Sequence, residues 1–138
     1  MEAPGRIWKP TLDCNDIASA AQFWKWLLGV EIILEVDTRH DGQGPTGLHL
    51  GPPEGPAVMS LQRVDDAKLT KNRMHLDVMT DDLGACIEQV VGRGGNLVDG
   101  PNGTEALEGA EAGAVFRWAV MADPQGNEFC LTTQVPGT

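Results

Sequence analysis

The pattern of apolar and polar residues repeats along the chain, in two halves of about sixty residues each. In each half a Leu-Asp pair precedes a stretch whose apolar residues recur three and four positions apart, which predicts an amphipathic helix. These pairs are Leu12-Asp13 and Leu76-Asp77, and the predicted helices end at Gly29 and Gly94. Short segments rich in apolar and β-branched residues follow each helix. The chain therefore predicts two βαβββ modules.

The first module is predicted over residues 6–64. Its helix begins after a cap at Asn15 or Asp16. The apolar face of that helix consists of Ile17, Ala20, Ala21, Trp24, Leu27 and Leu28. Strands are predicted at residues 6–14, 30–36, 47–50 and 57–64. Pro10 has no backbone N–H to donate, so the first strand should be irregular or lie at a sheet edge.

A charged connector, residues 65–71, leads to the second module over residues 72–134. A helix is predicted from Asp82 to Gly94. Its apolar face consists of Leu83, Cys86, Ile87, Val90 and Val91. Strands are predicted at residues 73–79, 96–98, 115–121 and 128–133. A long glycine-rich loop spans residues 100–113, and loops of this length in compact domains are often functional, so we expect it to cover the binding site.

Length and charge limit what the protein can be. The 138 residues suffice for one compact core, so residues 1–138 are predicted to form a single α+β domain. In that domain the paired βαβββ modules form a curved mixed β-sheet, shaped as a cup, with the helices outside. The net charge is −10, and no basic segment carries interleaved aromatic residues, which excludes nucleic acid as a partner. The acidity keeps the protein soluble and also suits a cationic small molecule.

Cysteine usage and hydropathy indicate the compartment. The three cysteines are odd in number and lack the C-x-x-C spacing of a zinc site, so a reducing cytoplasm is expected. No apolar run reaches the roughly eighteen residues that a membrane span needs, so the membrane is not expected as a partner.

Three segments resemble a known superfamily. They are Asp16 with Phe23-Trp24 and Leu28-Gly29, the string KNRMHLD at residues 71–77, and the string DPQGNEFC at residues 123–130. They are similar to the glyoxalase, bleomycin-resistance and extradiol-dioxygenase superfamily, also called vicinal oxygen chelate, and in particular to its glyoxalase-like domain subgroup. The resemblance implies the paired βαβββ fold predicted above and a homodimer. The superfamily includes metal-dependent lyases, isomerases, epimerases and dioxygenases, and also proteins that bind a drug without a metal.

The resemblance implies four positions at which metal-using members hold their ion. In the first module the position falls on Lys9 or on Thr11, depending on how the two modules are aligned, and on Gln62. In the second module it falls on His75 and Cys130. Lysine brings a positive charge that opposes a cation, and threonine is a poor ligand, so we predict that no metal binds.

A shifted metal site is the alternative. Glu128 lies two residues before Cys130 on a predicted strand, so the two side chains share a face. His75, Gln62 and Glu128 could then hold a divalent metal, with water as a further ligand.

Without a metal, His75 and Glu128 are the predicted catalytic residues, with His75 as a general base that a carboxylate orients. Lys9, Thr11, Gln62, Trp118 and Cys130 are the predicted ligand-binding residues, with Trp118 and Trp8 as an aromatic wall. Cys130 itself is expected to be an unreactive thiol.

The leading hypothesis is a glyoxalase-like protein that binds a small molecule in its sheet cup without the usual divalent metal. Two alternatives remain open: a divalent-metal-dependent lyase, isomerase or dioxygenase with the shifted ligand set, and a drug-sequestering resistance protein. Whether the protein is an enzyme stays undecided at this level, with lyase or isomerase chemistry as the catalytic option.

Overall fold

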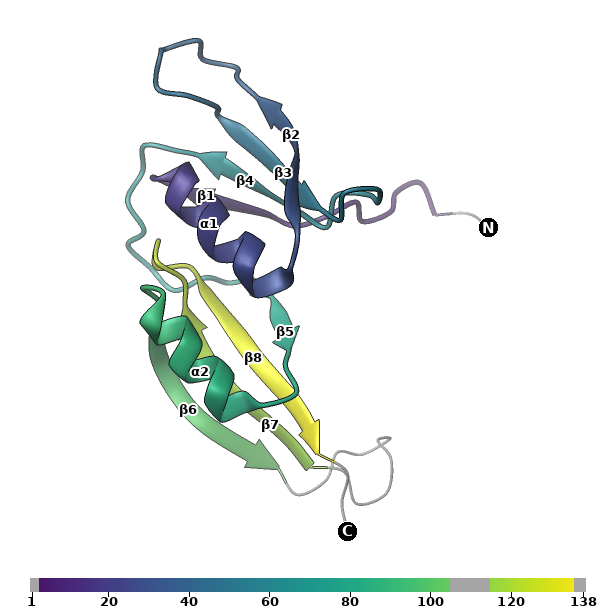
Figure 1. Cartoon of the computed structure of the whole chain (residues 1–138), viewed down its shortest axis with the longest axis vertical. Coiled ribbons are helices and arrows are strands. Elements are labelled where there is room, and N and C mark those ends of the chain that lie inside the picture. The colour runs from purple at the N-terminus through teal and green to yellow at the C-terminus, as the bar shows by residue number, and fades with distance from the viewer. Residues whose placement is uncertain (1–2, 105–114, 136–138) are drawn as a thin grey trace. The chain divides into compact units, whose positions relative to one another are not determined.

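A computed structural model describes residues 3–104 and 115–135. The chain divides into two compact units, Met1–Ala67 and Lys68–Thr138, hereafter the first and second units. Each unit contains one helix and one four-stranded mixed sheet, in the order βαβββ (Figure 1). The predicted α+β class and the paired modules are confirmed. The prediction of a single domain stays a prediction.

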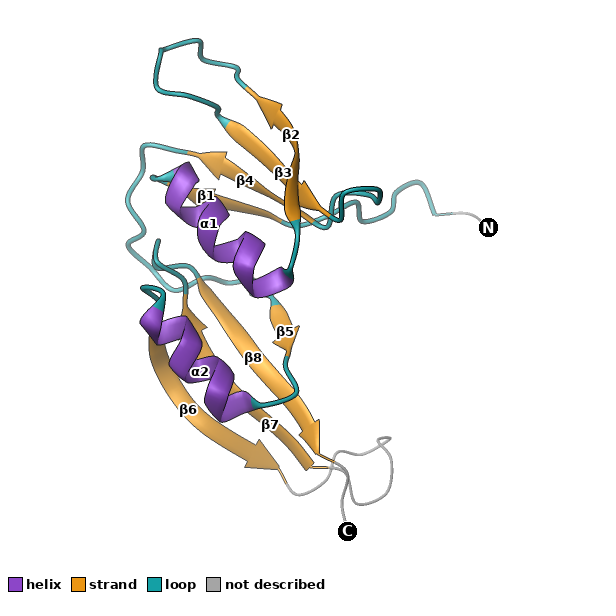
Figure 2. Cartoon of the chain, in the orientation of Figure 1, coloured by secondary structure: helices purple, strands orange, loops and turns teal. Residues whose placement is uncertain are grey.

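The first unit is built from five elements. They are β1 (Thr11–Cys14), α1 (Ile17–Leu28), β2 (Glu31–Val36), β3 (Gly47–Gly51) and β4 (Met59–Arg63). The strand order is β1-β4-β3-β2, with β1 parallel to β4 and the other neighbours antiparallel. Helix α1 packs on one face of this sheet (Figure 2).

Local signals in the sequence set the limits of α1. The Asp16 side chain accepts a hydrogen bond from the Ser19 N–H at 3.0 Å, which caps the first turn. Gly29 adopts a left-handed conformation with φ 65°, which a residue with a Cβ adopts only with strain, and so ends the helix. The helix buries Trp24 completely against the sheet.

Register assigns opposite roles to the two faces of the first sheet. Leu48 pairs with Leu61 and Leu50 with Met59, and all four side chains are buried in the core. Residues between them in sequence point the other way, because side chains alternate along a strand. The open face of the first sheet therefore carries polar side chains, namely Thr11, Asp13, His49, Ser60 and Gln62.

The second unit repeats this arrangement. Its elements are β5 (Asp77–Met79), α2 (Leu83–Gly92), β6 (Asn96–Thr104), β7 (Val115–Ala122) and β8 (Glu128–Val135). The strand order is β5-β8-β7-β6, with β5 parallel to β8. Phe129 and Leu131 of β8 face the core, with Met121 of β7 and Val90 of α2 also fully buried.

Three strands begin or end at other residues than predicted. Strand β1 begins only at Thr11, because Pro10 cannot donate to the ladder, although its carbonyl accepts from the Ser60 N–H at 2.9 Å. Strand β5 begins at Asp77, so His75 precedes the strand instead of lying within it. Strand β6 extends to Thr104 through a register shift, and so includes the start of the predicted loop. Residues 105–114 of that loop lie outside the described residues.

Within the described residues, neither helix is both long and apolar enough to cross a membrane.

Candidate functional site

A cavity of about 360 Å³ lies on the open face of the first sheet, hereafter the first-unit cavity. This volume falls in the range of sites that hold small organic ligands. Lys9, Thr11 and Gln62, three of the predicted ligand-binding residues, all line it. The structure thus brings together three positions that the sequence suggested, from the segment before β1, from β1 itself and from β4.

Ser60 lines the same cavity and has a special status. Its residue is 5% exposed, and its Oγ is the one buried side-chain polar atom without a hydrogen-bond partner among the described residues. A buried hydroxyl left without a partner costs about 1–3 kcal/mol, so such groups are rare in native proteins. The residue that carries this hydroxyl is also one of the residues that line the first-unit cavity.

The charged side chains of the cavity are all basic. Lys9, Arg39 and Arg63 line it, whereas no aspartate or glutamate is among the described lining residues. Lys9 Nζ lies 3.8 Å from the centre of the Trp8 ring, a cation–π contact. Lys9 forms no ion pair with a carboxylate among the described residues of the unit.

The two arginines differ from Lys9 in this respect. Arg63, which is 8% exposed, pairs with Asp41 at 3.1 Å and also donates to the Pro45 carbonyl at 3.3 Å. The hydrogen bonds and charge of Arg63, with the Gln43 N–H, hold the pKa of Asp41 below its usual value. Arg39 pairs with Asp65 at 3.1 Å. The charges of both arginines are thus balanced by carboxylates that are not among the lining residues.

One ring of an aromatic pair lines the cavity. The ring centres of Trp8 and His49 are 5.7 Å apart in an edge-to-face arrangement, and His49 lines the cavity. Burial, followed by the charge of Lys9, lowers the pKa of His49 below its usual 6.5, so the imidazole is neutral at pH 7. The sequence reasoning missed His49 and Ser60. Ser60 could have been found, because it lies two residues before Gln62 on one strand and shares its face.

The second unit holds a separate group of side chains. His75 Nδ1 lies 3.1 Å from Asp77 Oδ1, and one ligand atom from each of His75, Asp77 and Cys130 lies within 4.8 Å of the others. Register explains this, since Asp77 of β5 pairs with Cys130 of β8. Trp118 of β7 pairs with Thr132, so the half-buried Trp118 shares the face of Cys130, opposite to the buried core face.

These three residues fit a zinc-type metal by donor type alone, because they offer nitrogen, oxygen and sulfur. Burial, followed by the charge of Asp77 and a hydrogen bond to it, raises the pKa of Cys130, so a metal at this cluster would have to displace the thiol proton. The raised pKa also agrees with the expectation that Cys130 is not a nucleophile.

Glu128, predicted as catalytic, holds two backbone segments together. Its Oε2 accepts from the Asn72 N–H at 3.0 Å and lies 3.2 Å from Lys68 Nζ. Burial opposes its charged form, but these donors outweigh burial and leave the pKa of Glu128 below its usual 4.5. A carboxylate of this kind is a weak base. Among the described residues, the cluster around His75 does not include Glu128.

The paired four-stranded mixed sheets, each with one helix packed on it, form the fold seen in glyoxalase/bleomycin resistance/dioxygenase proteins of known structure. Residues 10–132 match the glyoxalase-like domain family. The chain belongs to that family. No curated protein matches the chain in sequence.

Solved structures share the fold at low sequence identity. An antibiotic binding protein, TnmS3 from Streptomyces sp. CB03234, is 23% identical over 98% of this chain and 100% of its own, with a TM-score of 0.61. A glyoxalase/bleomycin resistance protein/dioxygenase family enzyme from Burkholderia phytofirmans PsJN is 15% identical over 93% and 98%, with a TM-score of 0.62. A superfamily member from Sphaerobacter thermophilus DSM 20745 is 19% identical over 93% and 97%, with a TM-score of 0.59.

Proposed function

We propose that this protein binds a small organic molecule in the first-unit cavity, and that binding requires no divalent metal. The observation that carries the proposal is Ser60, a residue that lines the cavity and whose buried hydroxyl has no partner among the described residues. A ligand hydrogen bond would remove the cost of leaving that group unpaired. The same fold serves an antibiotic binding protein, TnmS3, which supports capture of a small molecule as the activity.

The metal-free part of the proposal rests on the residues that line the cavity. Lys9 places a positive charge there that no described carboxylate pairs with, and no carboxylate is among the described lining residues. His49 is the one lining residue of a type that transition metals favour. A divalent cation would therefore meet repulsion and too few ligands.

A metal-dependent lyase or isomerase is the second candidate, and the His75, Asp77 and Cys130 cluster favours it. In that case His75 and Asp77 would orient the metal, and Cys130 would lose its proton on binding it. The metal would supply Lewis-acid activation of a substrate oxygen.

Elemental analysis of freshly purified, untagged protein separates these candidates. We expect less than stoichiometric metal, and no change in melting temperature when Mg, Mn, Fe, Co, Ni or Zn is added singly. Stoichiometric metal that His75→Ala removes, with Asp81→Asn as a control for an exposed acidic residue on the same unit, would establish the second candidate.

Ligand capture is tested separately by screening aromatic and aliphatic small molecules for a rise in melting temperature. A compound that binds only the folded state raises this temperature by mass action. Absence of any hit at millimolar concentrations contradicts the proposal. The homodimer implied by the family is part of the same proposal, and sedimentation equilibrium with and without a hit measures it.

A further inference from the structure

We propose that the molecule bound in the first-unit cavity carries an anionic group, a carboxylate or a phosphate, which Lys9 Nζ and Ser60 Oγ bind together. This inference rests on the proposed function and names the chemical class of its ligand.

The sign of the local charge is the first argument. The chain has a net charge of −10, yet the charged side chains among the described lining residues are Lys9, Arg39 and Arg63. Asp41 and Asp65 balance the two arginines, so the uncompensated charge that faces the cavity belongs to Lys9. A concave, partly desolvated site with one unbalanced cation attracts an anion.

The hydrogen-bond donors supply the second argument. Thr11 and Ser60 are register partners in β1 and β4, and Gln62 is two residues further along β4 on the same face. A hydroxyl that donates to an ionised oxygen forms a shorter and stronger bond than one that donates to a neutral acceptor. The buried Ser60 Oγ–H has no competing acceptor among the described residues, and the Thr11 hydroxyl and Gln62 amide offer further donors beside it.

The remaining wall indicates what the anionic group is attached to. Val36 lines the cavity, and so does His49, which is neutral at pH 7 and stands edge-to-face with Trp8. These side chains suit the apolar or aromatic part of a ligand. The net negative charge of the chain by itself favours a cationic ligand. At this site the local charge is positive and favours an anionic one.

Four phenyl compounds of similar size test the ligand class. Phenylacetate and phenyl phosphate are the anionic probes, phenylacetamide is the neutral one and phenethylamine is the cationic one. We expect at least one anion to bind about tenfold tighter than phenylacetamide, as measured by titration calorimetry and tryptophan fluorescence. The difference between the two anions shows whether a carboxylate or a phosphate fits the site.

Three substitutions at two residues test the binding groups. Lys9→Gln should weaken binding of the preferred anion about tenfold and leave phenylacetamide binding unchanged, whereas Lys9→Arg should retain most of the affinity. Ser60→Ala should weaken anion binding severalfold without lowering the melting temperature, because the hydroxyl it removes has no protein partner. A purely structural serine would show the opposite result, a lower melting temperature with unchanged affinity.

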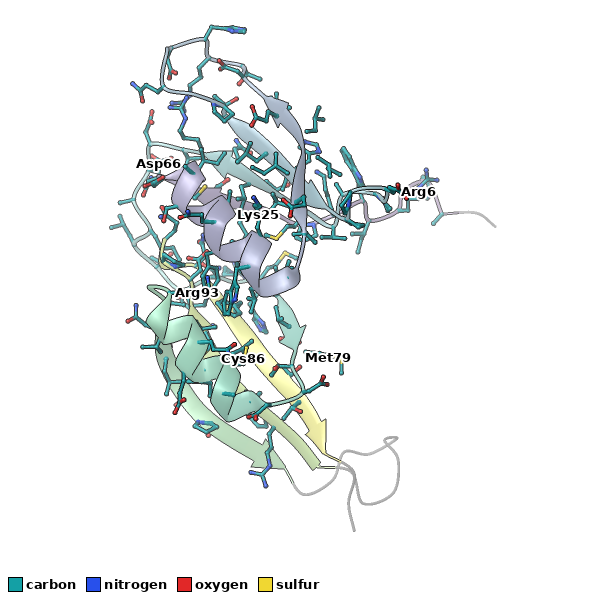
Figure 3. All side chains as sticks on the ribbon, in the orientation of Figure 1. Arg6, Lys25, Asp66, Met79, Cys86 and Arg93 are labelled. Carbon is teal, nitrogen blue, oxygen red and sulfur yellow. The ribbon has the colours of Figure 1, made fainter. Side chains whose placement is uncertain are left out.

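Lys25→Gln is the matched control. Lys25 lies on α1, the helix layer of the first unit (Figure 3), and pairs with Glu31 at 3.4 Å. This variant changes the net charge as Lys9→Gln does, but Lys25 is not among the residues that line the cavity. It should therefore leave the affinity of every probe unchanged.

Equal affinity for the anions and phenylacetamide, tighter binding of phenethylamine, or an unchanged anion affinity in Lys9→Gln would overturn the inference and leave the proposed function intact. If none of the four probes binds at millimolar concentration and no other screened compound binds, the proposed function fails with it. Circular dichroism of each variant confirms that the fold is retained.

Discussion

At the scale of single residues, His49 shows how packing changes the chemistry of a side chain. Burial of the imidazole, and then the nearby charge of Lys9, hold the pKa of His49 below its usual 6.5. His49 is the one described lining residue whose usual pKa lies near neutrality, and the other basic groups of the cavity are Lys9, Arg39 and Arg63. Binding and protonation are therefore linked at His49.

We expect an anion to bind more tightly as the pH falls from about 8 to about 5.5. An anion beside Lys9 offsets the charge that lowers the pKa of His49, so the complex takes up part of a proton. Benzenesulfonate, which stays ionised throughout, is the probe, and calorimetry in two buffers measures the proton uptake. His49→Gln should remove the pH dependence, and an affinity for the wild-type protein that does not change with pH would contradict the linkage.

The same shift affects stability without ligand. The unfolded chain takes up a proton at the usual pKa of 6.5, before the folded chain does. The neutral imidazole of His49 therefore contributes fully to the free energy of unfolding above pH 6.5. This contribution is lost as the pH falls toward the lowered pKa of the folded state.

At the scale of elements, the connection between the chain before β5 and the start of β8 depends on Glu128. The Asn72 N–H and the Lys68 ammonium both contact its carboxylate, and Lys68 also donates to the Thr70 carbonyl. These contacts hold residues 68–72 against the strand that pairs with β5. His75 and Asp77 follow this segment in the chain, and both lie close to Cys130.

Glu128→Gln should lower the free energy of unfolding by about 1 kcal/mol at pH 7, since an amide keeps a hydrogen-bond acceptor but loses the charge. The pKa of Glu128 lies below 4.5, so the stabilisation exists above that pH and is lost as the pH falls through the lowered value. Urea unfolding at pH 7 and pH 3.5 measures it. Glu88→Gln, on the exposed side of α2, is the control and should change little. A loss as large at pH 3.5 as at pH 7 would contradict the electrostatic explanation.

At the scale of the whole molecule, acidic residues outnumber basic ones by twenty to ten. Salt bridges on the described surface balance part of this charge, such as Lys25 with Glu31, but the excess remains and repels itself in the compact state. Screening this repulsion favours the folded chain.

The melting temperature should therefore rise by a few degrees between about 10 mM and 200 mM NaCl at pH 7. Differential scanning calorimetry measures the change. Lys9→Gln removes the ammonium group beside which chloride could bind. The same rise in melting temperature in that variant therefore assigns the effect to general screening. A rise confined to the wild-type protein would instead indicate chloride bound in the first-unit cavity.

The sequence by itself determined the paired βαβββ elements, the limits of α1 and the start of α2, because these depend on residues close together in the chain, whereas α2 ends at Gly92 instead of the predicted Gly94. Asp16 caps Ser19 three residues away, and Asp82 caps Ala85 over the same spacing. Gly29 ends α1 through its own backbone conformation. The periodicity of apolar residues likewise assigned Leu83 and Val90 of α2 to the core, although Val91, predicted on the same face, is 48% exposed.

Only the tertiary structure decided the charge and the free hydrogen-bond donors of the cavity. Asp41 neutralises Arg63 across 22 positions, and Thr11 meets Ser60 as a register partner in β1 and β4. Lys9 is left without a carboxylate partner among the described residues, while the acidic residues that dominate the composition lie elsewhere. Electrostatic and hydrogen-bond balance depends on distances between residues far apart in the chain, and composition carries no information about those distances.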